Sequence, residues 1–287
     1  MNFSYQEMTS RNIGFITPAQ QKTLSEATIF IPGVGGIGGA ALEALARMGV
    51  QKFIIADVDS FSVPNLNGQV FCSMETVGRP RIEATKEQLL LINPDMQIET
   101  FGADWVNQLH LILPRVNLVV NGCDDILSSV SLLRSAVQDE RTVINAFRSV
   151  LSSVYVVRPD DPRPEEFMGF PTVGKPIQPQ EKSLVSACRL KELEYVMCAS
   201  SSADHVLWEY SREVIKGQRA RFSLAPLVFM TGGMMAFEAM NVLLHQESKV
   251  TYRGVFWNPW RCQIEFPPGA LLHWWRAWQV RRVLRQL

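Results

Sequence analysis

The chain has 287 residues, of which 47% are hydrophobic, with 28 basic and 28 acidic side chains. This composition is ordinary for a folded domain and excludes collagen-like and intrinsically disordered chains. The net charge of zero gives no global attraction to nucleic acid, so we expect no nucleic-acid partner. No apolar run reaches the roughly 18 residues of a membrane span. Residues 227–244 come nearest and are expected to form a buried helix, so we expect no integral membrane segment.

The N-terminal sequence lacks the basic and apolar regions of a secretory signal. The five cysteines are scattered along the chain without a CxxC pair. These features predict a cytoplasmic protein with reduced thiols and no structural zinc site. Cys188 and Cys198 have neither a histidine nor a cluster of cations beside them, so they are interpreted as packed thiols.

Short β-rich runs alternate with helical stretches along the first half of the chain. Strands are expected at 28–32, 52–59, 96–101, 117–125, 142–147 and 151–159, and helices at 40–50, 82–94 and 127–138. This alternation predicts βαβ units and a parallel sheet covered on both faces. The fold class is therefore α/β, a Rossmann-like, doubly wound, mostly parallel sheet with additional C-terminal strands and a helix.

The second half of the chain is less regular. Residues 159–182 are rich in proline and are expected to be irregular, and 183–222 to be helical only in patches. A helix is expected at 224–244, and residues 250–266 are expected to form two strands that break at Asn258-Pro259. Residues 271–287 form a basic, aromatic helix, which either packs on the core or a dimer mate or binds a membrane surface or a peptide.

Gly33, Gly35 and Gly38 form a G-x-G-x-x-G loop between the first strand and the first helix. Such a loop lets a phosphate approach the backbone at the N-terminus of a helix. Asp57 ends the next strand, where an acidic side chain can bind ribose hydroxyls. The pattern predicts a nucleotide site and leaves both ATP and a nicotinamide cofactor open.

The residues after Asp57 carry a more specific signal. The stretches ADVDSFSVPNLNGQVF, VGRPRIEA and NGCDD, in this order and spacing, resemble the ThiF/MoeB and ubiquitin-activating-enzyme superfamily. The resemblance implies a domain that binds ATP and Mg²⁺ and adenylates a carboxylate. It favours ATP over a nicotinamide cofactor.

The resemblance also implies roles for single residues. Asp57 matches the ribose ligand, Asn65 an asparagine near the phosphates, and Asp124 the aspartate that holds Mg²⁺. Arg11 matches an arginine that reaches the triphosphate of the other subunit, which implies a homodimer. The expected catalytic residues are Arg11, Arg81 and Asp124, and the expected nucleotide-binding residues are Gly33, Gly35, Gly36, Gly38, Asp57, Asp59, Asn65, Asn67 and Lys86.

Two positions depart from the family pattern. Gly68 stands where the family has an arginine, and Arg81 stands where it has a lysine. We expect a nearby cation to replace the lost charge, with Arg81 the first choice and Arg79 or Arg148 the alternatives. The other interpretation is a non-catalytic nucleotide-binding partner protein.

The whole chain, 1–287, is interpreted as a single adenylation domain. Within it, residues 1–24 form an arm that reaches the dimer mate, and 159–222 form a segment on the substrate side. The absence of a zinc site and of a clear nucleophilic cysteine favours a family member that modifies a precursor peptide, as in the microcin C and pantocin pathways. The alternative substrate is the C-terminal glycine of a ubiquitin-like sulfur carrier protein.

Overall fold

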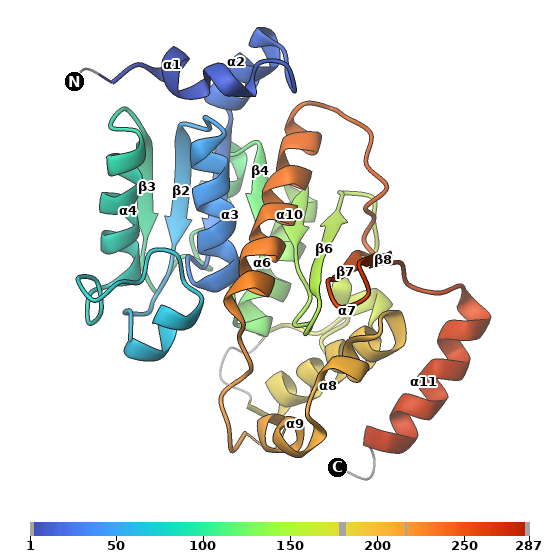
Figure 1. Ribbon diagram of the computed structural model, residues 1–287. Helices are drawn as coiled ribbons and strands as arrows, with labels where there is room; N and C mark the ends of the chain where they lie inside the picture. The colour runs from blue at the N-terminus through green and yellow to red at the C-terminus, as the bar shows by residue number, and fades with distance from the viewer. Residues whose placement is uncertain (1–2, 178–181, 216, 285–287) are drawn as a thin grey trace.

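One sheet organises the molecule. The computed structural model describes residues 3–177, 182–215 and 217–284. The strands of this described part are β1 (Thr28–Pro32), β2 (Lys52–Ala56), β3 (Gln97–Phe101), β4 (Leu118–Val120), β5 (Val143–Asn145), β6 (Ser152–Val157), β7 (Val255–Asn258) and β8 (Gln263–Glu265). They lie in the order β3-β2-β1-β4-β5-β6-β7-β8. The first five run parallel and the last three pair antiparallel, which confirms the predicted fold class (Figure 1).

Helices cover both faces of this sheet. One face packs against α3 (Gly36–Arg47), α4 (Arg81–Ile92) and α10 (Ala225–Leu243). The other packs against α5 (Leu109–Ile112), η3 (Leu113–Arg115), α6 (Ile126–Gln138) and α8 (Lys182–Ala199). The remaining helices are short or peripheral: α1 (Tyr5–Thr9), η1 (Ser10–Asn12), α2 (Pro18–Glu26), η2 (Val63–Asn67), α7 (Pro164–Phe167), η4 (Ser202–His205), α9 (Trp208–Ile215) and α11 (Ala270–Leu284).

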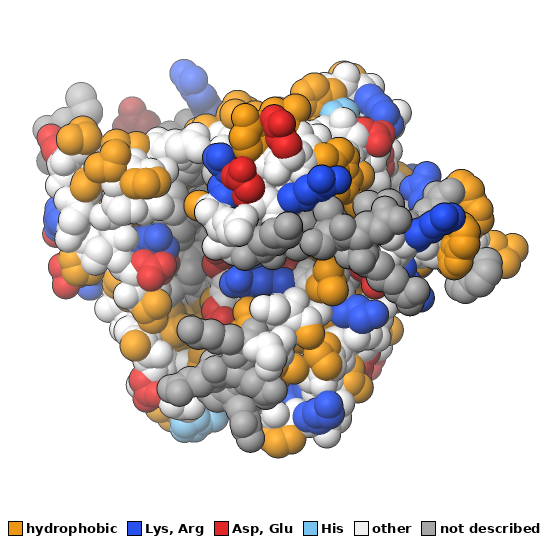
Figure 2. Space-filling model, turned by 90° about the horizontal axis from the view of Figure 1, so that it is seen from below, with side chains coloured by type: hydrophobic (Ala, Val, Ile, Leu, Met, Phe, Trp, Pro, Cys, Tyr) orange, Lys and Arg blue, Asp and Glu red, His pale blue; other side chains and the backbone are white. Residues whose placement is uncertain are grey.

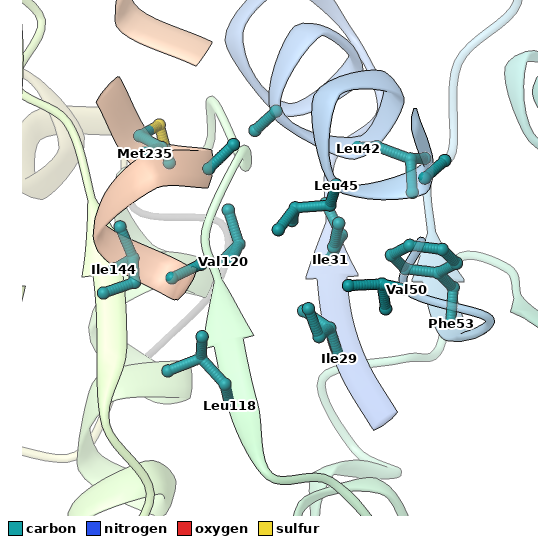
Figure 3. Close-up of a cluster of buried hydrophobic side chains, with 14 of the residues drawn as sticks. Ile29, Ile31, Leu42, Leu45, Val50, Phe53, Leu118, Val120, Ile144 and Met235 are labelled. Atoms are coloured by element: carbon teal, nitrogen blue, oxygen red, sulfur yellow. The ribbon is translucent and has the colours of Figure 1, made fainter. Parts of the chain in front are cut away.

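The central strands are buried on both sides. Ile29 and Ile31 of β1 join the cluster under α3 and α10, while Phe30 joins the cluster under α6 and α8. Figure 3 shows the first cluster, in which side chains of β1, β4 and β5 meet Leu45 and Met235 from the helices. Burying one such side chain stabilises the fold by about 1.5–3 kcal/mol. This two-sided burial explains why the strands are continuous apolar runs rather than alternating ones.

Helix α10 is the core helix expected near residues 224–244. It is the one helix in the described part of the chain that is long and apolar enough, by length and composition, to cross a membrane. Gly232 faces α3, where a Cβ would lie 2.5 Å from Ala40 Cβ. Met235, Ala236 and Ala239 are buried in the cluster under these helices. The helix therefore packs as part of the globular core.

The N-terminal helices α1 and α2 lie at the amino ends of the parallel strands (Figure 1). Thr17 caps α2 in a capping box with Gln20, and Pro18 follows at the first helical position. The segment is fixed to the end of α3. The Tyr5 hydroxyl donates to the Gly49 carbonyl over 2.7 Å, and Asn12 Nδ2 donates to the Met48 carbonyl over 3.0 Å.

The segment 159–222 has an irregular part and a helical part. Residues 159–177 contain only the short helix α7, as the prolines predict, and the helical patches expected in 183–222 are α8, η4 and α9, of which α8 is the longest. Residues 178–181 and 216 lie outside the described residues. The C-terminal helix α11 packs against α8, because Arg281 Nε lies 2.5 Å from Glu194 Oε1 and Arg276 donates to the Cys198 carbonyl over 3.2 Å. These contacts favour the packing interpretation of that helix.

Candidate active site

The glycine loop connects β1 to α3 at the carboxyl edge of the parallel sheet. Gly33 has a φ of +83°, and a Cβ there would lie 2.4 Å from the Gly122 carbonyl oxygen. A Cβ at Gly38 would lie 1.9 Å from the Gly33 oxygen and 2.9 Å from Gly122 Cα. The loop is therefore packed tightly against the end of β4, and only glycine fits at these positions. The first N–H groups of α3 are left to bind an anion.

Asp57 lies beside this loop because it follows β2, the neighbour of β1. Its carboxylate is buried and fixed, since the Val34 N–H donates to Oδ2 and the Asp59 N–H donates to Oδ1, each over 2.9 Å. Arg81, at the start of α4, lies in the same place. Its Nη1 is 2.9 Å from Asp59 Oδ2 and 3.6 Å from Asp57 Oδ1. The structure thus brings these three predicted residues together.

Two polar atoms beside the glycine loop are buried without a partner. They are Gln69 Oε1 and Arg81 Nε. A Cβ at Gly35 would lie 3.5 Å from Arg81 Nη1 and 3.7 Å from Gln69 Nε2, so both side chains face the middle of the loop. Buried polar groups normally have hydrogen-bond partners, so these atoms point to a polar ligand. Gln69 lies in the NLNGQ motif but was not among the predicted nucleotide ligands.

Asp124 lies on the other side of the loop, just after β4. The next residue, Asp125, caps α6 by accepting from the Ser128 N–H over 2.8 Å, so only Asp124 is left to face the site. Arg221 Nη1 lies 3.2 Å and Arg148 Nε 3.5 Å from Asp124 Oδ1. Desolvation raises the pKa of Asp124, but the cations of Arg221, Arg148 and Arg189 outweigh it and hold this pKa below its usual value.

Arg148 links this cluster to the protein interior. Its Nη1 lies 2.7 Å from Oε2 of the buried Glu192, and its Nη2 donates to the Asp124 carbonyl. Burial lowers the pKa of Arg148, but Glu192 and Asp124 outweigh it and raise this pKa, so the guanidinium stays charged. Arg148 was one of the three arginines expected near the phosphates. Glu192, Arg189 and Arg221 come from the polar segment 183–222 and carry no sequence signal of this role.

The two sides of the glycine loop differ in charge. Beside Asp57 there are two carboxylates and one guanidinium, whereas Arg148, Arg189 and Arg221 all act on Asp124, with Glu192 as a second partner of Arg148. Figure 2 shows the face at the carboxyl ends of the strands, where basic and acidic side chains gather around a hollow in its middle. This arrangement fits a nucleotide, since carboxylates accept from ribose hydroxyls and arginines bind phosphates.

The other predicted nucleotide ligands hold the surrounding loop. Asn65 Oδ1 accepts from the Ser62 N–H over 2.9 Å, and Asn67 Nδ2 donates to the Ser223 carbonyl over 2.9 Å. Lys86 lies half-buried on α4, further along the helix from Arg81. Arg79 pairs with Glu87 over 2.6 Å and not with Asp57 or Asp59. Direct ligand roles for these side chains stay predictions.

Arg11 lies far from the glycine loop of its own chain. It is an exposed residue of η1, which is fixed to the C-terminal end of α3. The loop lies at the opposite end of this 12-residue helix, about 18 Å away at 1.5 Å per residue. Arg11 could therefore act only on a nucleotide bound by another copy of the chain, and both this role and the homodimer stay predictions.

The two cysteines interpreted as packed thiols are fully buried. Burial raises the pKa of Cys188 and of Cys198 to about 11. A thiol with such a pKa is protonated near neutral pH and is a poor nucleophile. Both side chains therefore act in packing.

The donor set at Asp124 suits Mg²⁺ better than a metal held by protein ligands alone. The Asp124 carboxylate is 83% exposed, and it is ionised near neutral pH because its pKa is lowered. Mg²⁺ is commonly bound by one or two carboxylates together with phosphate oxygens and water. In residues 3–177, 182–215 and 217–284, no group of three or more His, Cys, Asp and Glu side chains could hold a metal.

Comparison with curated proteins finds several partial relatives. The chain is 27% identical over 139 residues to the tRNA threonylcarbamoyladenosine dehydratase of Bacillus subtilis, which is 48% of this chain and 55% of that protein. It is 44% identical over 82 residues to protein HesA of a Nostoc species, which is 29% and 32% of the two chains. It is 25% identical over 245 residues to the molybdopterin-synthase adenylyltransferase of Salmonella typhimurium, and this match covers 85% of this chain and 84% of that protein. The chain thus spans about half of the first relative and a third of the second.

Solved structures share the fold. Escherichia coli MccB, solved with MccA, has a TM-score of 0.66 and 18% identity, and the match covers 93% of this chain and 74% of that chain. PaaA has a TM-score of 0.65 and 16% identity, with 93% and 84% covered. At these identities the likeness shows the fold alone. The family match extends over residues 9–269, which include the glycine loop and both aspartates of the site, and so the chain belongs to the ThiF family.

Proposed function

We propose that this chain uses ATP and Mg²⁺ to activate a carboxylate by adenylation. The observation that carries the proposal is the division of charge across the glycine loop, with the buried Asp57 on one side and arginines around Asp124 on the other. A dinucleotide cofactor would need no cation cluster at Asp124. Adenylation needs one, because a carboxylate and a triphosphate, both anions, must come together.

Each part of the site has a role in this reaction. The Asp57 carboxylate accepts hydrogen bonds from the ribose, and the N-terminus of α3 binds a phosphate through its free N–H groups. Asp124 would hold the Mg²⁺, which when bound would neutralise charge on the phosphates. Arg81 lies beside Asp57, where its unpartnered Nε can donate to the α-phosphate or the ribose.

The chemical step is a displacement at phosphorus. An oxygen of the substrate carboxylate attacks the α-phosphorus, the bond from this phosphorus to the bridging oxygen breaks, and pyrophosphate leaves with the bonding electrons. The products are the acyl adenylate and pyrophosphate. Cations fixed before the reaction stabilise the charge that moves onto the leaving group.

The substrate that we propose is the carboxylate of a precursor peptide, either a Glu or Asp side chain or the C-terminus. Support comes from the fold likeness to MccB, whose structures include complexes with MccA and with ATP, over more than nine-tenths of this chain. The C-terminal glycine of a sulfur carrier protein is the second candidate. The adenylyltransferase relative that matches 84% of its own length favours it.

ATP–pyrophosphate exchange tests both the proposed adenylation reaction and the proposed peptide substrate. The wild-type chain is offered ATP, Mg²⁺ and labelled pyrophosphate with a precursor peptide, a Gly-Gly-ended carrier or a tRNA. We expect label to enter ATP only with Mg²⁺ and a carboxylate acceptor, and most strongly with the peptide. Exchange with the carrier alone would move the substrate to the second candidate. Binding of ATP without exchange in any arm would favour a non-catalytic nucleotide-binding partner protein.

A further inference from the structure

Gly68 leaves a charge missing at the site, and the structure shows what fills the space. A Cβ at Gly68 would lie 3.2 Å from Ser223 Oγ and 3.5 Å from Val228 Cγ2. Asn67 Nδ2 fixes this contact by donating to the Ser223 carbonyl. Val228 also borders the N-terminus of α3, since a Cβ at Gly36 would lie 3.2 Å from its Cγ1. The chain that leads into α10 therefore borders the place where a side chain at position 68 would begin.

Arg221 enters the site from this same stretch of chain. It lies two residues before Ser223, and its Nη1 is 3.2 Å from Asp124 Oδ1. The side chain is 51% exposed, so it can change partner without leaving a buried charge behind. Arg148 contacts the same Asp124 oxygen but is also bound to the buried Glu192, which fixes it in place. Arg221 is thus the more mobile cation of the two.

Arg81 cannot fill this place alone. Its guanidinium lies on the Asp57 side of the loop and is paired with two carboxylates, those of Asp57 and Asp59. Its positive charge is therefore already offset by two negative ones. Near Asp124 the cations are less fully offset, because Arg148, Arg189 and Arg221 all act on the exposed Asp124 carboxylate and Glu192 pairs with Arg148.

We propose that Arg221 replaces the arginine missing at position 68 and binds the β- or γ-phosphate of ATP. The proposal rests on the ATP-dependent adenylation argued above. Asp124 would hold the Mg²⁺ when it is bound, and Arg221 would then be free to take a triphosphate oxygen as its partner. The cation then comes from a different segment of the chain but reaches the same end of the site.

Binding of ATP and of AMP, measured by calorimetry with Mg²⁺ and no acceptor, tests this assignment. AMP has the ribose and α-phosphate but no β- or γ-phosphate. We expect Arg221→Ala to lose about ten- to hundredfold in affinity for ATP, the range of a hydrogen bond to a charged group, and to keep its affinity for AMP. Arg219→Ala is the matched control, because Arg219 lies in the same segment and pairs with Glu213 over 2.6 Å. It should bind both nucleotides as the wild type does.

A second-site change gives an independent readout. Gly68 has a φ of −168°, an extended conformation open to any residue, and its nearest neighbour is the end of a serine side chain. We expect Gly68→Arg, added to Arg221→Ala, to restore the preference for ATP over AMP. If the wild type binds ATP and Arg221→Ala keeps the full preference, the assignment is wrong while the proposed function stands. If the wild type does not bind ATP, both are wrong.

Discussion

At the scale of single residues, we expect the two adjacent aspartates after β4 to separate catalysis from folding. Asp124 is exposed among arginines, whereas Asp125 Oδ2 caps α6. We expect Asp124→Ala to lower the rate of ATP–pyrophosphate exchange at least about a hundredfold, because Mg²⁺ then lacks its protein ligand. The free energy of unfolding should change little. Asp125→Ala should instead lose about 0.5–2 kcal/mol of stability, as N-cap substitutions do. Exchange kinetics and urea unfolding of the two variants check this.

The opposite pattern would contradict the assignment. If Asp125→Ala abolished exchange while it stayed folded, and Asp124→Ala remained active, Asp125 would be the metal ligand and the cap would be incidental. ATP binding is the third measurement. It should weaken less than exchange in Asp124→Ala, because the glycine loop and Asp57 are untouched.

At the scale of elements, the α3–α10 contact positions the site, because α3 presents its N-terminus to the nucleotide. Gly232 and Gly233 of α10 form a matched pair. A Cβ at Gly232 would lie 2.5 Å from Ala40 Cβ and 2.8 Å from the Ala41 nitrogen, whereas a Cβ at Gly233 meets nothing within 4 Å. We expect Gly232→Ala to lose about 1–3 kcal/mol through overpacking. Gly233→Ala should gain up to about 1 kcal/mol of helix propensity.

Urea unfolding followed by circular dichroism measures both changes. Equal effects of the two substitutions would mean that α10 does not pack against α3 as described. Gly232→Ala should also weaken ATP binding, since a shift of α3 moves the N–H groups of the glycine loop. Gly233→Ala should leave ATP binding unchanged.

Most of the elements could be predicted from the sequence because their signals are local. β1 and β2 are short apolar runs, the glycine loop has its own spacing, and Asn258-Pro259 marks the break between β7 and β8. Helical patches were predicted over 183–222, but the length of α8 was not, because its many polar residues obscure the periodicity of the face that packs on α6 and α11.

The Asp57 side of the site was predictable because its signals are also local, whereas the arginines around Asp124 were not predictable as a group. Asp57 and Arg81 belong to motifs close to the glycine loop. Arg221 is 97 positions from Asp124 along the chain, in a stretch with no motif. Only the packing of the chain before α10 against Gly68 brings it to the site.

At the scale of the whole molecule, α10 and η2 both expose large apolar side chains. Phe229 and Phe237 of α10 are 47% and 59% exposed, and Val63 and Leu66 of η2 are 61% and 40% exposed. The beginning of α10 contacts η2 through Val228 and Gly68, so these side chains lie on adjoining elements. Exposed apolar patches of this kind mark interfaces. We expect the homodimer to cover this surface and Phe237→Glu to produce a folded monomer in analytical ultracentrifugation.

Phe237→Glu also separates what one copy of the chain does alone from what needs the dimer. The monomer should still bind AMP, because Asp57 and the glycine loop belong to one chain, but it should lose exchange. Lys249→Glu, an exposed charge change in the loop after α10, is the control and should stay dimeric and active. A wild type that is monomeric and active would contradict the dimer.

A dimer gives Arg11 a place to act. Arg11 is about 18 Å from its own glycine loop by the rise of α3, and it is exposed, so it can serve only the site of a partner. Arg11→Ala and Asp124→Ala chains should each be inactive alone. In a mixed dimer, one site combines an intact Asp124 with an intact Arg11 from the partner, and the other site carries both defects. When equal amounts of the two variants are mixed and their subunits redistribute freely, about a quarter of the wild-type rate of ATP–pyrophosphate exchange should therefore return.

Lys22→Ala is the control. Lys22 lies on α2 of the same N-terminal segment and pairs with the exposed Glu26 over 3.7 Å, so this variant should be active without mixing. A mixture that stays inactive although ultracentrifugation shows mixed dimers would mean that Arg11 does not act across the interface.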